Sequence, residues 1–443
     1  MTSELISRRT ALLGTMGTMV AGSLTLAGCG GGGSDSGGNT QLRAINLTSD
    51  LPSVDLFTDD TSQFSALAPQ TLAAYKGVAS KEYTLRVKKA GDGATLLSGT
   101  FTLGKDQNFT AVIWGRETAL RLQTLPENEN NDTIATGNAR VRIFNATTDS
   151  GAVDVFFTSA AADLGETAPT QPSIGAGTLS GFREISAGTY RLRVTGVGDP
   201  TDLRLDISGV VLAAKQHFNL VLTAGIGGVL LNGVLIQQQA AAVVMRNTKA
   251  RVRLVAGVDG AGVVAVTAAG NNLLLPLRSP TLGRYVSVDA GALPLQFRVN
   301  GTVISETTQT FVAGADYTLL AFGPLAAPSL RLITDDNRLP SLASRVKLRV
   351  IHGANGIDPI TLSADFQAVA SDIPLRSASA FINTASGTTV RIDVTSASAG
   401  AALFTEQPVN LQSQAVYTVF LLGGNTSPAT GAPVPQGFIR KER

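Results

Sequence analysis

Few residues in this chain have the types and spacing that catalysis or metal binding requires. The 443 residues include only two histidines, His217 and His352, and neither has a partner histidine at metal-ligand spacing. Each lies at one end of an apolar segment, so we interpret both as structural side chains. A Ser-His-Asp triad would need one of them, and no Gly-x-Ser-x-Gly motif is present. The sequence predicts no catalytic residue, no metal ligand and no enzyme activity.

Glycine-rich and acidic segments give no stronger indication of chemistry. Gly260-Ala261-Gly262 fits the loose dinucleotide pattern, but that pattern has meaning only where it opens a helix after a strand. It is followed here by an alternating apolar segment, which indicates a glycine turn and no cofactor. The acidic pairs Asp59-Asp60 and Asp335-Asp336 are predicted to be solvated turn residues.

One acid recurs after a variable loop, at Asp55, Asp154 and Asp358, with Val264 in the corresponding place of a third segment. Carboxylates beside loop carbonyls can hold calcium, but tight binding needs several clustered acids. The alternative is that each carboxylate accepts hydrogen bonds from backbone N–H groups and fixes its turn. We favour this structural role.

The strongest local motif surrounds the only cysteine. The first 28 residues combine Arg8 and Arg9 with an uncharged stretch and small closing residues, which is typical of a secretory signal peptide. Leu26-Ala27-Gly28-Cys29 resembles the lipobox of bacterial lipoproteins, which implies diacylglycerol on the Cys29 thiol and a membrane as partner. The alternative is an ordinary signal peptide or an uncleaved anchor.

The segments beside Cys29 indicate export and a tether. Arg8-Arg9 with the glycine-diluted stretch resembles a twin-arginine signal, although Ala11 departs from the usual phenylalanine, so the general secretory route stays open. Residues 29–40 are rich in Gly and Ser and predict a flexible tether. Gly30 after the cysteine resembles the rule for outer-membrane sorting. We expect a location in the cell envelope, at the outer membrane and facing the periplasm or the surface.

Composition limits the remaining possibilities. A net charge of +2 with 15% charged residues and no basic run gives no electrostatic footprint for nucleic acid. One cysteine allows no intrachain disulfide, so each core must be stable without one. The length after the tether indicates about three or four domains.

Internal repeats define four copies of one domain. An arginine within an apolar opening strand recurs about every 100 residues, at Arg43, Arg142, Arg253 and Arg349. A mid-domain aromatic follows each arginine, at Tyr75, Phe182, Tyr285 and Phe381. A second aromatic opens an apolar strand, at Phe109, Phe218, Tyr317 and Tyr417.

Segments such as Tyr83–Val87 alternate apolar and polar residues, which is typical of half-buried strands. Short strands with Gly, Asn and Asp turns and without a convincing amphipathic helix predict an all-β fold of four tandem immunoglobulin-like (Greek-key) β-sandwich domains. The expected domains are 41–126, 139–239, 250–340 and 346–443, with linkers at 127–138, 240–249 and 340–345. The uncharged stretch 226–245 could span a bilayer by length, but Asn232-Gly233 predicts a hairpin turn within it.

These landmarks resemble the bacterial family called domain of unknown function 4397. Its opening arginine strand, its Val-Asp strand and its two tyrosine strands are matched by Arg349–Gly353, Val54-Asp55, Val153-Asp154, Ala187–Tyr190, Gly314–Thr318 and Tyr417-Thr418. The resemblance covers nearly all of residues 41–443 and implies no biochemical activity.

We therefore expect a lipid-anchored envelope protein whose repeats act as a structural or binding module, with an envelope protein or a glycan as possible partner. The alternative is a carbohydrate-binding accessory protein, or an envelope enzyme whose site no motif reveals. Because sugar sites expose flat aromatic rings and Trp114 is the only tryptophan, the carbohydrate-binding form is the weaker one.

Overall fold

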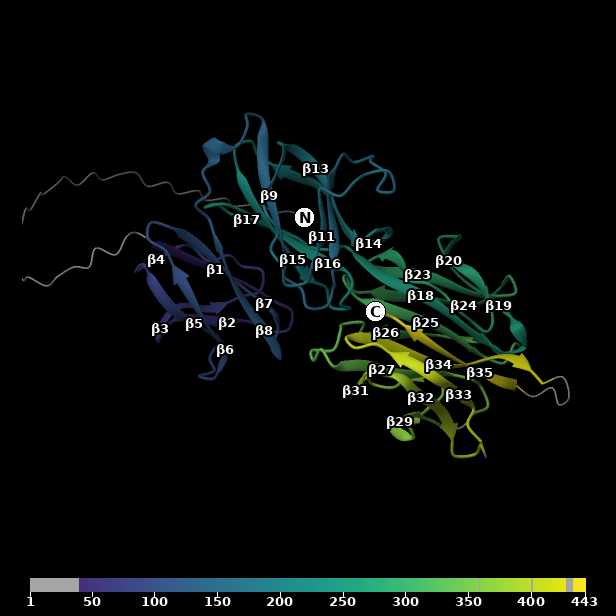
Figure 1. The fold of residues 1–443 in the computed structure, drawn as a ribbon. Helices are drawn as coiled ribbons and strands as arrows, with labels where there is room; N and C mark the ends of the chain where they lie inside the picture. The colour runs from purple at the N-terminus through teal and green to yellow at the C-terminus, as the bar shows by residue number, and fades with distance from the viewer. Residues whose placement is uncertain (1–39, 358, 400, 428–432) are drawn as a thin grey trace, which may run out of the picture. The chain divides into compact units, whose positions relative to one another are not determined.

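The computed structural model describes residues 40–443 except 358, 400 and 428–432, so Cys29 and the tether lie outside the described residues. The described chain has no α-helix, and its strands form eight sheets. Figure 1 follows them from the purple first repeat to the yellow fourth. The all-β fold of four tandem sandwiches is confirmed.

The first repeat pairs the sheet β4-β1-β7-β8 with the sheet β3-β2-β5-β6. Its strands are β1 (Thr40–Thr48), β2 (Val54–Thr58), β3 (Thr61–Leu67), β4 (Lys76–Val78), β5 (Lys81–Lys89), β6 (Thr95–Leu103), β7 (Asn108–Arg116) and β8 (Ala119–Pro126). A short 3-10 helix, η1 (Asn131–Thr133), follows.

The second repeat pairs the sheet β12-β9-β15-β16-β17 with the sheet β11-β10-β13-β14. Its strands are β9 (Asn138–Asn145), β10 (Val153–Thr158), β11 (Gln171–Ile174), β12 (Arg183–Ser186), β13 (Gly188–Gly196), β14 (Asp199–Leu212), β15 (His217–Ala224), β16 (Leu231–Gln237) and β17 (Ala242–Met245).

The third repeat pairs the sheet β21-β18-β25-β26, in which β22 also joins β18, with the sheet β20-β19-β23-β24. Its elements are β18 (Lys249–Val258), η2 (Asp259–Ala261), β19 (Val263–Ala268), β20 (Asn271–Arg278), β21 (Thr281–Leu282), β22 (Val286–Asp289), β23 (Gly291–Val299), β24 (Thr302–Phe311), β25 (Asp316–Gly323) and β26 (Ser329–Asp335). The turn expected at Gly260 is η2, and a strand follows it.

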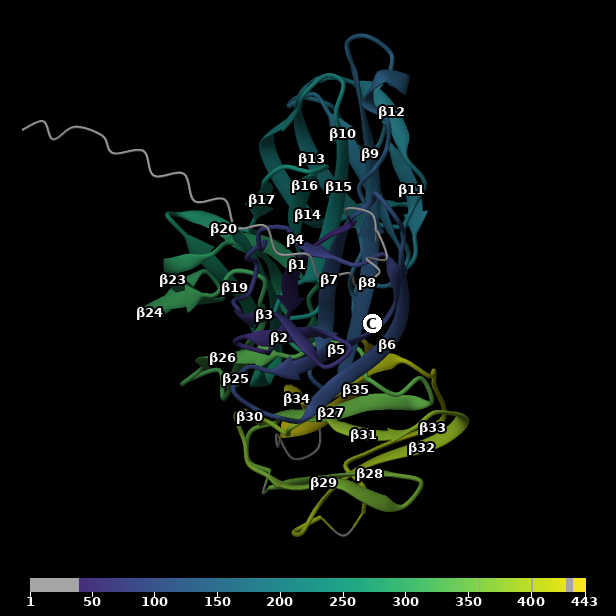
Figure 2. The same cartoon turned by 90° about the vertical axis from the view of Figure 1, so that its left-hand side faces the viewer.

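The fourth repeat pairs the sheet β30-β27-β34-β35, in which β31 also joins β27, with the sheet β29-β28-β32-β33. Figure 2 shows these two layers one above the other. The strands are β27 (Arg345–Gly353), β28 (Ile360–Ala364), β29 (Gln367–Ile373), β30 (Ser377–Ala378), β31 (Ile382–Ala385), β32 (Gly387–Ser396), β33 (Phe404–Leu411), β34 (Ala415–Thr426) and β35 (Pro433–Lys441).

All four repeats share one topology. The opening strand runs parallel to the strand that carries the second aromatic, in the pairs β1/β7, β9/β15, β18/β25 and β27/β34. A hairpin partner lies antiparallel on the other side of that aromatic strand. The repeated residues therefore occupy equivalent places in the four sandwiches.

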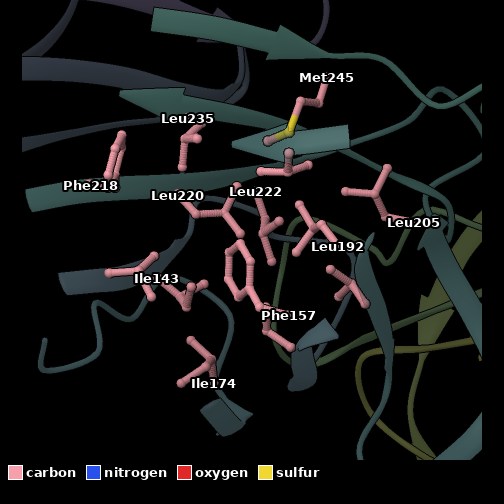
Figure 3. Packing of buried hydrophobic residues seen from close by; sticks show 14 of the residues in the cluster. Ile143, Phe157, Ile174, Leu192, Leu205, Phe218, Leu220, Leu222, Leu235 and Met245 are labelled. Carbon is pink, nitrogen blue, oxygen red and sulfur yellow. The ribbon is translucent and has the colours of Figure 1, made fainter. Parts of the chain in front are cut away.

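Each sandwich encloses its own hydrophobic core. In β5, Tyr83, Leu85 and Val87 are buried while the residues between them are partly exposed, as a two-residue period requires. In the second repeat, Phe157 from one sheet lies among Leu192 and Leu222, as Figure 3 shows. Leu222 comes from the opposite sheet, so the core joins the two layers.

The opening and aromatic strands are buried on both faces. In β1, Leu42 and Ala44 belong to the core of the first repeat, whereas Ile45 and Leu47 belong to a second cluster with Phe144 of the next repeat. A matching cluster joins the third and fourth repeats through residues that include Val255, Leu320, Ile351 and Phe420. Repeats therefore pack in pairs, which explains why these strands are continuously apolar.

Two sequence expectations for the second repeat were wrong. Asn232 and Gly233 lie inside β16, paired with Thr223 and Leu222, and the turn runs instead from Gly225 to Leu230. A Cβ on Gly233 would come within 2.9 Å of the Met245 side chain, so close packing explains this glycine. The segment expected as a linker at 240–249 contains β17, which pairs with β16. Within the described residues, no helix has the length and apolar character needed to cross a bilayer.

Tyr317 tests the core directly. It packs edge to face against Phe311, and its hydroxyl accepts a hydrogen bond from the Val312 N–H at 3.0 Å. Tyr317→Ala should lower the free energy of unfolding by about 3–5 kcal/mol, measured by urea denaturation. Phe366→Ala is the control, because Phe366 is 76% exposed and its loss should change stability by less than about 0.5 kcal/mol. Equal effects of the two variants would contradict the core assignment.

Candidate functional site

The four repeated arginines lie on the faces where repeats pair. Arg43 shares the face of Ile45 and Leu47 on β1, and Arg349 shares the face of Ile351 on β27. All four arginine side chains are buried, Arg253 completely. Buried guanidinium groups need compensating partners, so their contacts define the site.

The mid-domain aromatic of each repeat covers its arginine. The guanidinium carbon lies 4.4–4.6 Å from the ring centroid in the pairs Arg43/Tyr75, Arg142/Phe182, Arg253/Tyr285 and Arg349/Phe381. These are cation–π contacts in a desolvated setting, where they are worth about 2 kcal/mol each. The regular spacing of these aromatics along the sequence therefore reflects one repeated contact.

The parallel aromatic strand supplies the next partner. Arginine Nε donates to Thr110 Oγ1 at 2.8 Å, to Thr318 Oγ1 at 2.9 Å and to Thr418 Oγ1 at 3.2 Å in the first, third and fourth repeats. In the second repeat Asn219 Oδ1 accepts from Arg142. A short polar side chain thus holds the same edge of each guanidinium.

An acid at the end of the hairpin partner completes three of the four clusters. The position directly after the residue paired with the second aromatic is occupied by Glu127, Gln238, Asp335 and Glu442. Arg253 binds both oxygens of Glu442 at 2.7 Å, and Arg349 binds Asp335 at 2.5 Å. The third and fourth repeats therefore exchange acids across their interface.

The first and second repeats use a different arrangement. Arg43 Nη2 binds Glu127 of its own repeat and also donates to the backbone oxygen of Gln237 in the second repeat, while Nη1 donates to the backbone oxygen of Ala240. Arg142 donates to the Pro126 oxygen of the first repeat at 2.9 Å. In this pair of repeats, backbone carbonyl groups take the place of some of the acids that the third and fourth repeats supply to each other.

The electrostatics of these clusters favour the paired charged forms. Burial acts to raise the pKa of Asp335, but Arg349 and Arg253 outweigh it, so the pKa is lowered. Burial raises the pKa of Tyr285 well above its usual value, so its hydroxyl stays protonated and donates to Asp335 at 2.6 Å. The same acid accepts from Thr318 at 2.6 Å. Both of its oxygens therefore take part in structural bonds, Oδ1 with Arg349 and Oδ2 with Tyr285 and Thr318.

Asp335 was missed by sequence reasoning. It was expected to be a solvated turn residue, but its side chain is buried in the ion pair with Arg349. The acids Glu127 and Glu442 were not identified at all. What these acids share is their position at the end of the strand that pairs with the second aromatic. This position can be recognised only once the strand register is known.

The prediction of one recurring acid, at Asp55, Asp154 and Asp358, was partly wrong. Asp55 Oδ1 accepts from the Ala66 N–H at 2.6 Å, and Asp154 accepts from Ser173 and Gly198 at 2.7 and 2.9 Å, as the structural interpretation expects. Strand register, however, aligns Val264 with Val54 and therefore places Ala265 and Thr361 at the Asp55 position. Asp358 lies outside the described residues. No group of three or more His, Cys, Asp or Glu residues suited to a metal occurs in the described part of the chain.

The two histidines lie in separate repeats. His217 Nδ1 is 2.8 Å from Asn131 Oδ1, its ring packs edge to face on Phe182, and burial lowers its pKa. His352 is completely buried on β27. The structure does not bring them together. Cys29 lies outside the described residues, so its role stays a prediction.

Glu442 tests the exchanged pairs. Glu442→Gln leaves the Arg253 guanidinium buried without its counter-charge, which should cost about 3–5 kcal/mol of unfolding free energy. Lys81→Gln is the control, because its pair with Asp59 is solvent-exposed and its removal should leave the urea midpoint unchanged. A Glu442→Gln midpoint equal to that of the wild type would contradict a structural role for the pair.

The ion pairs of Asp336 predict that the stability of the protein depends on pH. Burial acts to raise the pKa of Asp336, but bonds from Arg338 and Lys347 lower it from 3.8 to about 2. Because the folded pKa lies below the unfolded value, its contribution is present above about pH 4 and is lost as pH falls toward about 2. The stability difference between wild type and Asp336→Asn, measured by urea denaturation, should shrink over that range. A constant difference would contradict the assignment.

Comparison with known proteins identifies a family. The model described as Domain of unknown function (DUF4397) matches residues 40–156 and 250–362. No curated protein matches the chain. Several solved structures show a similarity, and two of them, both at low sequence identity, are described below.

The first is the crystal structure of CBMbc (family CBM26) from Eubacterium rectale Amy13K in complex with maltoheptaose. It is 14% identical over 46% of this chain and 97% of that chain, with a TM-score of 0.16. The second, the Bacillus anthracis TIE protein, is 10% identical over 86% of this chain and 67% of that chain, with a TM-score of 0.14. At TM-scores this low, neither likeness defines the fold or the ligand of this chain.

Each family match begins at an opening arginine strand, β1 or β18, and ends inside the second strand of the following repeat, β10 or β28. The matched segments thus contain the arginine, the two aromatics and the closing acid of the first and third repeats. Together they span more than half of the chain. The chain belongs to the family described as Domain of unknown function (DUF4397).

Proposed function

We propose that this protein is a lipid-anchored component of the bacterial cell envelope whose four domains act as a non-catalytic structural or binding module. The observation that carries the proposal is that the repeated arginines take part in buried structural contacts. Arg43, Arg253 and Arg349 are held by buried acids, aromatic rings and neighbouring repeats, so they stabilise an array of sandwiches. Such an array presents loops and sheet edges for recognition.

The proposed anchor is the lipid on Cys29. The lipobox-like motif, the position of Cys29 after an uncharged stretch and the Gly/Ser-rich tether support it. Several acyl chains on one cysteine would give stable membrane attachment, whereas one chain binds only reversibly. Gly30 supports an outer-membrane location, reached by the twin-arginine or the general secretory route.

The alternative function is glycan binding. One observation favours it: Phe366 is 76% exposed at the hairpin tip between β28 and β29, with its backbone at a φ of +66°. A bulky residue with positive φ is uncommon and marks a site worth testing. Trp114, in contrast, is buried against Phe144 and offers no platform. A glycan array with residues 40–443 that gives hits lost in Phe366→Ala would favour this alternative.

Cys29→Ala tests the anchor. The variant lacks the only thiol, so it should move from the membrane fraction to the soluble fraction when cells are separated by ultracentrifugation. Ser34→Ala, in the same tether, is the matched control and should stay with membranes. A Cys29→Ala protein that sediments with membranes and resists an alkaline wash would contradict lipid anchoring.

A further inference from the structure

We propose that a basic pocket beside the interface of the third and fourth repeats binds a phosphate-bearing group. The pocket has a volume of about 720 Å³, within the range of about 300–1,000 Å³ usual for ligand sites. Its charged and aromatic lining consists of Arg116, Arg331, Asp336, Lys347, Arg349 and Phe381. Four cations line the pocket: Arg116, Lys347 and Arg349 are paired with Asp149, Asp336 and Asp335, which leaves Arg331 without a carboxylate partner among the described residues.

The inner part of this wall is fixed by partners. Lys347 Nζ lies 2.8 Å from the backbone oxygens of Asp336 and Arg338 and 3.0 Å from Asp336 Oδ2. Arg349 is held by Asp335 and Thr418. Because both side chains are immobilised, their positive charges are in place before any ligand arrives, which reduces the entropic cost of binding.

Two other arginines supply available donors. Arg116 uses Nη2 to bind Asp149 Oδ1 and the Leu339 oxygen, both at 2.9 Å, while its buried Nε has no hydrogen-bond partner among the described residues. Arg331 is exposed on β26, and its side chain makes no hydrogen bond or ion pair with any described residue. Because this Nε is shielded from solvent, a ligand can reach Arg116 only at its terminal nitrogens, whereas the Arg331 side chain is exposed.

The electrostatic surroundings agree with an anionic ligand. Burial lowers the pKa of Lys347, and the neighbouring cations Arg338 and Arg116 lower it further, although Asp336 opposes them. The inner cations each have a carboxylate partner, Asp336 for Lys347 and Asp335 for Arg349, whereas Arg331 has none among the described residues. An anion would give Arg331 the counter-charge that the other three cations already have.

Phosphate fits the donor set better than a single carboxylate. The planar guanidinium of Arg331 can bind two oxygens of one phosphate, and further oxygens of the same group stay available for Arg116. The inference rests on the proposed binding module and gives it a ligand class. It does not depend on the Cys29 anchor, so the two can fail separately.

Pyrophosphate is the probe for this pocket. Calorimetric titration of the purified full chain in detergent should show saturable binding, and Arg331→Gln should weaken it about tenfold, the scale of one lost charge-assisted contact. Arg278→Gln is the matched control, because Arg278 is an exposed strand arginine of the same repeat outside the pocket, and its affinity should equal that of the wild type. Absence of binding by the wild type, or equal affinity in Arg331→Gln, would overturn the proposal.

A second measurement identifies the source of the phosphate. The Cys29→Ala chain is mixed with vesicles of phosphatidylcholine containing phosphatidic acid, or of phosphatidylcholine alone, and bound protein is measured by flotation. Pyrophosphate binding without flotation supports a soluble phosphate ligand. Pyrophosphate binding together with flotation that occurs only with phosphatidic acid and is lost in Arg331→Gln supports a lipid phosphate. Flotation that Arg331→Gln does not change, without pyrophosphate binding, would overturn the pocket.

Discussion

Burial of the repeated arginine is the constraint on which the arrangement of the repeats depends. A guanidinium in an apolar interface is unfavourable unless its charge and its donors are all satisfied. Arg253 reaches this state only when Glu442 arrives from the fourth repeat, and Arg349 only when Asp335 arrives from the third. Neither repeat can satisfy its arginine alone by this route. The two sandwiches are therefore coupled in one register, and the apolar cluster around Phe420 stabilises the interface that the ion pairs align.

This coupling changes the view of the chain as four independent domains. The opening strands carry apolar residues on both faces because one face packs in its own core and the other packs on the next repeat. A single sandwich would expose Ile351, Phe420 and a buried arginine to water. The stability of each copy thus includes a large neighbour contribution, as in repeat proteins whose units stack. The repeat pair is the smallest unit in which this surface is covered.

The sequence was sufficient for the fold class and for the repeat landmarks, because strand alternation and aromatic spacing are local or periodic signals. It was insufficient for the partners of the arginines. Arg253 and Glu442 are separated by 189 residues, and no local pattern connects them. Asp335 has the composition of a turn residue and becomes structural only through Arg349. Asn232-Gly233 has hairpin chemistry, yet pairing on both edges of β16 overrides it. The Asp55 alignment failed because loops of unequal length hide the register.

In the second repeat, the buried arginine is satisfied without an acid at the end of the hairpin partner. Gln238 occupies the place of the acid, so Arg142 relies on Asn219 and the Pro126 oxygen, and burial lowers its pKa. Gln238 instead binds the backbone of Glu129 through both ends of its amide, which fixes the connection between the first two repeats. The first pair thus has one buried acid for two arginines, whereas the second pair has two. The third and fourth repeats each supply an acid to the arginine of the other, so each needs a partner that carries an acid at that position. This difference disfavours pairing of the first or second repeat with the third or fourth.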